Sequence, residues 1–123
     1  IKTIQFPIKA TSYLSIGKRS GTRIEQLDEI AKKVSRGQKV LIVDDIFETG
    51  LTLKAIRKRL EKRTSNIKTA TLYWKAGASK NNAKPDFYLR KTSRWIVFPH
   101  EVDGLSRNEI KRKDKVIYKL LFE

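Results

Sequence analysis

Apolar residues recur with two different spacings in the first third of the chain. From position 4 to position 8 every second residue is apolar, which predicts a strand over Lys2–Ile8. Residues with helical spacing follow and predict a helix that ends before Gly37; they are Ile24, Leu27, Ile30, Ala31 and Val34. Between these elements Ala10–Thr22 is rich in Ser, Thr and Gly, and we interpret it as a long loop.

The middle of the chain follows a strand, helix, strand order. Lys39–Val43 is dominated by β-branched and other apolar residues, which predicts a fully buried strand of a parallel sheet. Asp44–Gly50 is expected to form a turn into a helix over Thr52–Arg63, and Lys68–Trp74 predicts a further strand. This order predicts an α/β fold with a mostly parallel sheet flanked by helices.

Weaker patterns cover the rest of the chain. Lys75–Pro85 is polar and is interpreted as a loop, followed by short strands at Phe87–Leu89 and Trp95–Phe98. Ser106–Leu121 predicts a C-terminal helix. No internal repeat or domain boundary is visible, so we expect a single domain over residues 1–123.

The charge balance narrows the choice of partners. The chain has 28 Lys and Arg against 13 Asp and Glu, a formal net charge of +15. Such a chain attracts nucleic acid, anionic membranes or phosphorylated metabolites, although a solvated basic surface without a specific partner is the alternative. Cysteine is absent, which excludes disulfides and thiolate metal sites. No apolar run is long enough to cross a membrane, so we expect a soluble, cytoplasmic protein.

Acidic residues stand directly after the buried strand, where ligands of parallel sheets bind. Asp44 and Asp45 repel each other and gain nothing from a core, but they can accept hydrogen bonds from sugar hydroxyls or hold a divalent cation. Glu48–Thr52 leads into a helix whose free N–H groups form an anion site, and Gly50 lets the backbone approach the anion. The segment suits a ribose 5-phosphate; an acidic turn with a threonine cap is the alternative.

The segment Val40–Thr52 resembles the binding signature for 5-phosphoribosyl-1-pyrophosphate (PRPP) in type I phosphoribosyltransferases. The resemblance implies that Asp44 and Asp45 contact the ribose hydroxyls, directly or through Mg²⁺. It also implies that the 5′-phosphate is held by Glu48, Thr49, Gly50, Leu51 and Thr52. Many relatives carry Asp where this chain has Glu48, and in purine-specific members that residue assists proton transfer at the imidazole nitrogen of the base. Glu48, Asp44 and Asp45 are therefore the candidate catalytic residues.

The resemblance extends to the 6-oxopurine branch, whose members act on hypoxanthine, xanthine or guanine. It implies that Lys75 donates to the exocyclic oxygen of the base, and that Trp95 stacks on the purine beside Ile96. A buried core aromatic is the alternative for Trp95. Glu101 matches an acidic position linked to Mg²⁺ in some relatives, so the implied metal ligands are Asp44, Asp45 and Glu101.

The Ser, Thr and Gly-rich segment matches the position of the flexible catalytic loop in this family. Ser12 and Tyr13 would belong to that loop, which closes over the site and excludes water from a cationic transition state. Lys18 and Arg19 are candidates for pyrophosphate contacts, with solvated charge as the alternative. Family members begin with a strand and a pyrophosphate-binding loop that we cannot identify here. Because the first residue is Ile1, we expect a processed, trimmed or incomplete N-terminus.

The reaction implied by the resemblance joins PRPP and a purine base, with Mg²⁺, to give a nucleoside monophosphate and pyrophosphate in purine salvage. A homodimer is the expected oligomer. The second hypothesis is a regulator of the same fold that senses PRPP or nucleotides and binds nucleic acid, which the positive charge favours. The sequence shows no helix-turn-helix pattern and no zinc-finger spacing. A sugar or nucleoside kinase is excluded because a Gly-rich loop with lysine is missing.

Overall fold

The chain forms two compact units, Ile1–Ser93 and Arg94–Glu123. The computed structural model describes residues 3–13, 21–24, 26–79 and 82–123. No helix among these residues has the length and apolar character that a membrane crossing requires. Each unit is described separately below.

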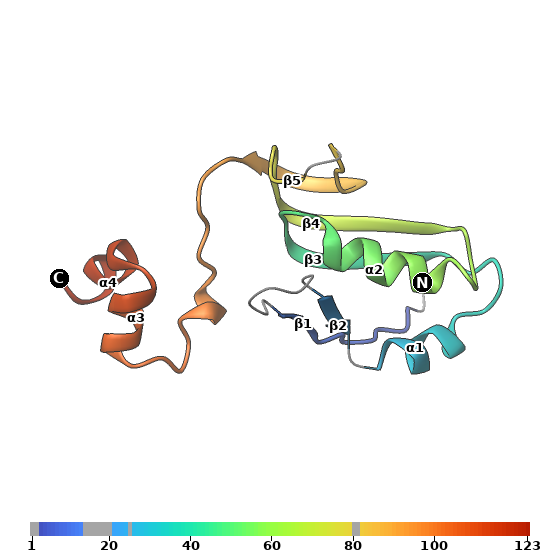
Figure 1. Cartoon of the computed structure of the whole chain (residues 1–123), viewed down its shortest axis with the longest axis horizontal. Helices are drawn as coiled ribbons and strands as arrows, with labels where there is room; N and C mark the ends of the chain where they lie inside the picture. Colours follow the sequence, from blue (N-terminus) through green and yellow to red (C-terminus); the bar gives the residue numbers. More distant parts are fainter. Residues whose placement is uncertain (1–2, 14–20, 25, 80–81) are drawn as a thin grey trace. The chain divides into compact units, whose positions relative to one another are not determined.

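A three-stranded parallel sheet organises the first unit (Figure 1). Its strands are β3 (Val40–Phe47), β4 (Ile67–Lys75) and β5 (Phe87–Thr92), paired in the order β3-β4-β5. The register places Val40 opposite Ile67 and Phe47 opposite Trp74, so β3 and β4 end side by side. The α/β class and the parallel sheet are thereby confirmed.

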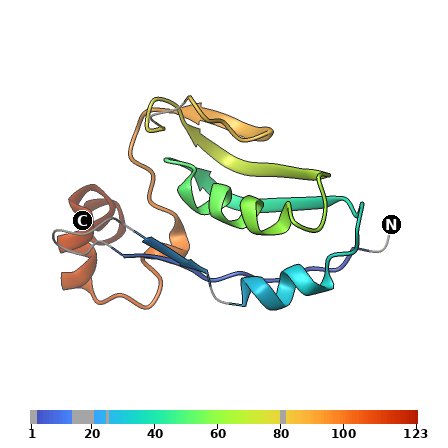
Figure 2. The same ribbon diagram turned by 45° about the vertical axis from the view of Figure 1, so that its right-hand side comes forward.

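Helix α2 (Leu51–Leu60) connects β3 to β4 and lies along one face of the sheet (Figures 1 and 2). Helix α1 (Leu27–Lys33) packs beside it. The two helices and the sheet share one apolar cluster, which consists of Ala31, Val34, Ile42, Phe47, Leu53, Ile56, Leu60 and Ile67. Burying each large apolar side chain is worth about 1.5–3 kcal/mol, so this cluster supplies most of the driving force for the unit.

Strand β3 is buried on one face only, and the prediction of a fully buried strand is wrong. Ile42 is buried under α2, whereas Leu41 and Val43 are 56% and 71% exposed. Leu72 of β4 is also 49% exposed. Successive side chains of a strand point to opposite faces, and α2 covers only one of them within the described residues. A run of apolar residues therefore does not show whether one face or both faces of a strand are covered.

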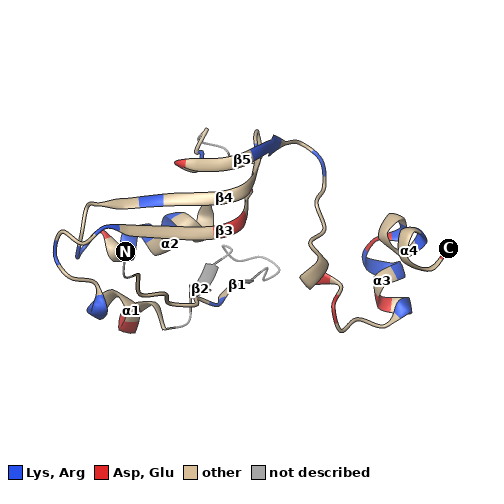
Figure 3. Ribbon diagram, turned by 180° about the vertical axis from the view of Figure 1, so that it is seen from behind, with Lys and Arg blue, Asp and Glu red and all other residues tan. Residues whose placement is uncertain are grey.

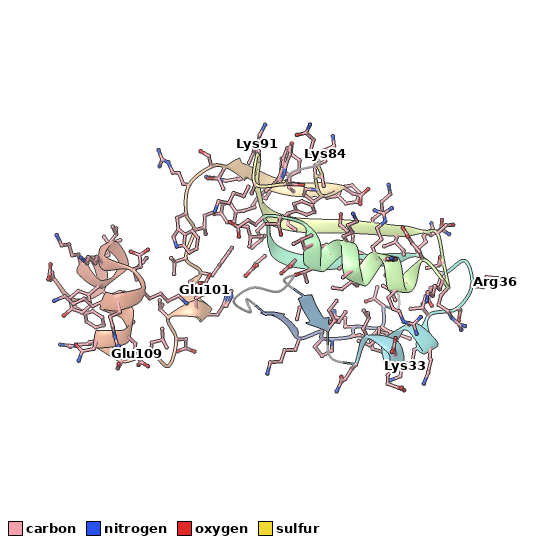
Figure 4. The ribbon with its side chains drawn as sticks, viewed as in Figure 1. Lys33, Arg36, Lys84, Lys91, Glu101 and Glu109 are labelled. Carbon is pink, nitrogen blue, oxygen red and sulfur yellow. The ribbon has the colours of Figure 1, made fainter. Side chains whose placement is uncertain are left out.

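The first part of the chain differs from the predicted strand and loop. No strand forms over residues 3–9 in the described structure, because no neighbouring strand pairs with them there. Phe6 instead contacts α1, because Nζ of Lys33 lies 5.4 Å from the centre of its ring (Lys33 is labelled in Figure 4). The predicted loop contains an antiparallel pair, β1 (Ala10–Tyr13) with β2 (Gly21–Ile24), whose backbone groups bond each other. Residues 14–20 lie outside the described residues.

The second unit departs from its predicted elements at two places. Residues 95–98 form no strand and lead into a short 3-10 helix, η1 (Pro99–Glu101), because none of the described strands pairs with them. The predicted C-terminal helix is two helices, α3 (Arg107–Lys113) and α4 (Lys115–Phe122). Asp114 has extended backbone between them, and its carboxylate accepts hydrogen bonds from the N–H groups of Val116 and Ile117 at 2.8 and 3.0 Å. An aspartate with a helical pattern on both sides acted as an N-cap.

The remaining elements are confirmed with shifted ends. The first helix begins at Leu27 rather than Ile24, the second helix ends at Leu60 rather than Arg63, and the strand after the polar loop continues to Thr92. Helix ends commonly fray or tighten by a few residues, and strand ends depend on the neighbouring strand, which a local pattern does not contain.

The position of the core predicts that the same Leu→Ala substitution lowers the free energy of unfolding by different amounts at a buried and at an exposed leucine. Leu60 is 2% exposed, and Leu60→Ala should lower the free energy of unfolding by about 2–5 kcal/mol through lost burial and a cavity. Leu89 is 73% exposed, and Leu89→Ala should change stability by less than about 0.5 kcal/mol. Urea unfolding followed by circular dichroism measures both. Equal losses in the two variants would contradict this assignment of the core.

Candidate functional site

The carboxyl ends of β3 and β4 carry oppositely charged side chains that meet. Because Phe47 pairs with Trp74, the next residues along both strands, Glu48 and Lys75, come side by side. Nζ of Lys75 donates to Oε1 of Glu48 at 2.5 Å. The structure therefore brings together the predicted base-binding lysine and the predicted catalytic glutamate.

Asp44 and Asp45 belong to β3 and not to the turn that the sequence predicted. Backbone pairing with β4 continues past them to Phe47, so only residues 48–50 turn towards α2. Both aspartates are half-buried, and the N–H of Asp45 donates to Oδ1 of Asp44 at 2.9 Å. Figure 3 shows acidic positions, in red, at the carboxyl end of β3.

The Asp44 carboxyl is held in an unfavourable electrostatic environment. Burial is the main cause that raises its pKa above the ordinary value of 3.8; the Asp45 N–H opposes this, and the charge of the Asp45 side chain adds to it. A cation or sugar hydroxyls at this position would relieve the penalty. Such cost at a single carboxylate is typical of a site shaped for a ligand.

The turn into α2 forms a pocket of 230 Å³ directly beside Asp44. Its lining residues are contiguous in the sequence except for one position, and they are Asp44, Ile46, Phe47, Glu48, Thr49, Gly50, Leu51, Thr52 and Leu53. The Thr49 hydroxyl accepts the N–H of Leu51 at 3.4 Å, and the first carbonyl bonded inside the helix is that of Gly50, which accepts from Lys54 at 2.9 Å. The backbone N–H groups of the first turn of a helix have no acceptor within the helix and point outward. This is the arrangement that binds an anion.

Gly50 is required by the shape of this turn for two separate reasons. It caps α2 with φ of 75°, in the left-handed region that other residues rarely adopt. A Cβ at this position would also lie 2.5 Å from Cζ of Phe47, whose ring is 5% exposed in the core. The sequence predicted that Gly50 lets an anion approach the backbone, but not that Gly50 lies against Phe47. The sequence feature that pointed to this contact is the aromatic residue three positions before the glycine of the turn.

Three predicted site residues lie in the second unit. Trp95 is 70% exposed, and Ile96 is half-buried. The Glu101 carboxylate accepts the N–H of Phe98 at 3.3 Å and pairs with Nζ of Lys113 at 3.2 Å. The roles of Trp95, Ile96 and Glu101 towards a base or a metal stay predictions.

Two further predicted residues belong to the antiparallel β1–β2 pair. Ser12 and Tyr13 are in β1, so their backbone is part of a paired strand rather than of a loop. Lys18 and Arg19 lie outside the described residues.

Comparison with known proteins identifies the family. The phosphoribosyl transferase domain family matches residues 5–107. The chain belongs to this family.

Individual relatives agree with this assignment. The hypoxanthine-guanine phosphoribosyltransferase of Lactococcus lactis subsp. lactis (strain IL1403) is 35% identical over 71 residues, which are 58% of this chain and 38% of that protein. The hypoxanthine/guanine phosphoribosyltransferase of Methanothermococcus okinawensis is 45% identical over 51 residues, 42% of this chain and 28% of that protein. The resemblance to the 6-oxopurine branch is thereby confirmed.

A solved structure extends the similarity to the fold. The crystal structure of a purine phosphoribosyltransferase from Pyrococcus horikoshii Ot3 superposes with a TM-score of 0.56 at 28% identity and covers 75% of this chain and 57% of that one. The chain spans 38% and 28% of the lengths of the two relatives matched by sequence, so the alignments concern part of those proteins.

The donor set of this phosphoribosyltransferase domain fits a magnesium ion that is shared with a phosphorylated ligand. Among the residues described, no three or more His, Asp or Glu side chains gather into a metal site. The carboxylates of Asp44 and Glu48 line the pocket, and Asp45 follows Asp44 on β3, so hard oxygen donors lie at this end of the strand. Mg²⁺ is commonly held by one or two carboxylates together with substrate oxygens and water, so a two-carboxylate wall suits it.

The strained environment of Asp44 predicts a gain in stability when its charge is removed. The raised pKa means that the folded state takes up a proton at higher pH than the unfolded chain does. Stability from this group is therefore present below the unfolded pKa of 3.8 and is lost as pH rises through the higher folded pKa. Asp44→Asn should be more stable than the parent at pH 7, with the difference shrinking as pH falls towards 3.

Urea unfolding of both proteins across this pH range measures the effect. The control is Glu29→Gln, which removes an exposed carboxylate paired with Lys32 on the surface and should be nearly neutral. An Asp44→Asn variant less stable than the parent at pH 7 would contradict the electrostatic argument.

The packing around Gly50 predicts that its replacement by alanine lowers the free energy of unfolding more than the same change at Gly77. Gly50→Ala and Gly77→Ala both place a side chain at positive φ, with φ of 75° and 89°, which costs about 1–2 kcal/mol. Only at Gly50 does the new Cβ collide with Phe47, whereas nothing lies within 4 Å at Gly77. Gly50→Ala should therefore lose at least about 1 kcal/mol more than Gly77→Ala in thermal or urea unfolding. Equal losses would show that Phe47 moves away freely.

Proposed function

We propose that this chain carries the phosphoribosyl-binding part of a purine phosphoribosyltransferase. The reaction transfers the phosphoribosyl group of PRPP to hypoxanthine, guanine or xanthine and gives a nucleoside monophosphate and pyrophosphate, as purine salvage requires. The observation that carries the proposal is the pocket beside Asp44, with carboxylates on its wall, a helix start at its base and Lys75 at its edge. Membership of the family and the hypoxanthine-guanine enzymes among the relatives support it.

The pocket accounts for the sugar phosphate half of the ligand. The 5′-phosphate binds to backbone N–H groups at the start of α2 and to the hydroxyls of Thr49 and Thr52. The ribose hydroxyls then lie towards Asp44 and Asp45, which accept their hydrogen bonds. This arrangement orients C1′ of the sugar, and orientation of the reacting groups is a large part of catalysis in group transfer.

The base binds on the β4 side of this pocket. The ammonium of Lys75 donates to the exocyclic oxygen of a 6-oxopurine, whereas an amino group at that position would leave two donors facing each other. Mg²⁺, held by Asp44 and Asp45, would neutralise charge on the departing pyrophosphate. Glu48 is the candidate for proton transfer at the imidazole nitrogen. Trp95, Ile96 and Glu101 stay candidates for contacts to the base and the metal on the strength of the family resemblance.

The surroundings of the reaction follow from its chemistry. PRPP, nucleoside monophosphates and pyrophosphate are charged metabolites that do not cross membranes unaided, so we place the activity in the cytoplasm. A homodimer remains the proposed assembly.

The distribution of charge does not favour the alternative of a nucleic-acid-binding regulator. Exposed lysines recur every four residues, at Lys54 and Lys58 of α2 and at Lys62 in the turn after it. Acidic residues are interspersed with the basic ones on this part of the unit (Figure 3). Three basic side chains there are paired, in the ion pairs Arg57–Glu61, Arg59–Asp28 and Lys32–Glu29. Part of the basic charge around α1 and α2 is thus balanced by nearby carboxylates, which makes this part of the unit less suited to a polyanion.

Binding of a monophosphate tests the assigned phosphate site. Thr49→Val and Thr52→Val keep the side-chain shape and remove one hydroxyl each. Since a hydrogen bond to a charged group is worth about 1.5–3 kcal/mol, each variant should bind guanosine monophosphate about 10- to 100-fold more weakly in calorimetric titration. The exposed Thr3 provides the control, because Thr3→Val should leave the affinity unchanged. Parent-like affinity in both site variants would refute the proposed phosphate position.

A further inference from the structure

The ion pair between Glu48 and Lys75 differs from the surface pairs of this chain. Its two atoms are 2.5 Å apart, and the side chains of Lys75 and Glu48 are 20% and 45% exposed. The surface pair Lys32–Glu29 has side chains that are 71% and 68% exposed. Fully exposed pairs are worth little, because water and salt screen them, whereas a pair whose lysine is mostly shielded from water is screened less.

The backbone restricts where this pair can sit. Glu48 follows directly after Phe47, whose ring is buried against Gly50, and Lys75 ends a strand that is paired on both edges. Lys75 is carried by a paired strand, and Glu48 by the first position of the short turn that follows β3. Lysine has a flexible stem with four carbons, so its ammonium takes a defined position only if a partner selects it.

A second lysine, Lys91, lies close to the residue that precedes Lys75. Nζ of Lys91 on β5 lies 4.9 Å from the ring centre of Trp74, the residue before Lys75 (Figure 4). Trp74 thus has a cation on its ring and another next to it in the chain. The Glu48 carboxylate draws the Lys75 ammonium to the β3 side, where the pocket beside Asp44 lies.

We infer that Glu48 is a positioning residue that sets base selectivity through Lys75. This inference rests on the proposed function and deepens it. An ammonium has three N–H donors, so a lysine bonded to a carboxylate can still donate to an oxygen of a ligand. Glu48 holds Nζ of Lys75 where it meets the exocyclic oxygen of a 6-oxopurine. The glutamate therefore acts on the base through the lysine.

This role makes a different prediction from direct proton transfer by Glu48. If Glu48 served only as an acid or base, its loss would slow the chemical step and leave binding of the product unchanged. If it positions Lys75, its loss lowers the affinity for a 6-oxopurine nucleotide and spares a 6-aminopurine nucleotide. The effects of losing either partner should also overlap, because they remove the same interaction.

The experiment is a double-mutant cycle with Glu48→Gln, Lys75→Gln and the combined variant. Calorimetric titration measures the affinities for guanosine monophosphate and adenosine monophosphate. We expect Lys75→Gln to weaken guanosine monophosphate binding about tenfold or more and Glu48→Gln at least about fivefold. Adenosine monophosphate affinity should change less than about twofold, and the double variant should be no weaker than Lys75→Gln alone.

The matched control is Lys68→Gln, which removes a lysine from the opposite end of β4, where it pairs with Asp86 at 3.1 Å. It should keep the parent ratio of the two affinities. Losses that multiply in the double variant, or a parent-like ratio in Glu48→Gln, would overturn the inference and leave the proposed function standing. Failure of the parent to bind either nucleotide would overturn the proposed function and this inference with it. Circular dichroism of every variant verifies that the fold is retained.

Discussion

The register between β3 and β4 is the constraint on which the rest of the first unit depends. It places Phe47 opposite Trp74, so both strands end at the same level and their following residues meet as the pair of Glu48 and Lys75. It also requires a crossover, because parallel neighbours cannot be joined by a tight hairpin. Helix α2 is that crossover, and its apolar side supplies Leu53, Ile56 and Leu60 to the core. The start of α2 then necessarily lies at the ligand end of the sheet.

The end of β3 and the turn after it contain features that lower the stability of the fold. Apolar residues at the end of β3 would be compatible with the packing of α2 on the sheet. The chain has two carboxylates there instead, Asp44 and Asp45, and burial raises the pKa of Asp44. The turn that follows uses a glycine at positive φ, pressed against the ring of Phe47. Unfavourable local features persist where the surrounding packing holds them, and they concentrate at sites that receive a ligand. Here they gather within one segment that lines one pocket.

Much of the fold was predictable because it depends on local periodicity. Helical spacing predicted α1 and α2, and β-branched runs predicted β3 and β4, with ends that shifted by a few residues. The failures share a cause, since each depended on what lies beside the segment. Residues 3–9 alternate like a strand but have no paired neighbour in the described structure, and β3 carries an apolar run with one covered face. Asp114 divided a continuous helical pattern because its carboxylate capped the second helix.

The sequence by itself determined which chemical groups the site contains, because the order Asp44, Asp45, Glu48, Thr49, Gly50, Thr52 is a short motif whose members are neighbours in any conformation. It also determined the family, through the same motif. Only the tertiary structure decided that Lys75 pairs with Glu48 across 27 positions and that Gly50 lies against Phe47. Those contacts follow from strand register and from the packing of a helix on a sheet. Both are long-range properties, and no local pattern of residues specifies them.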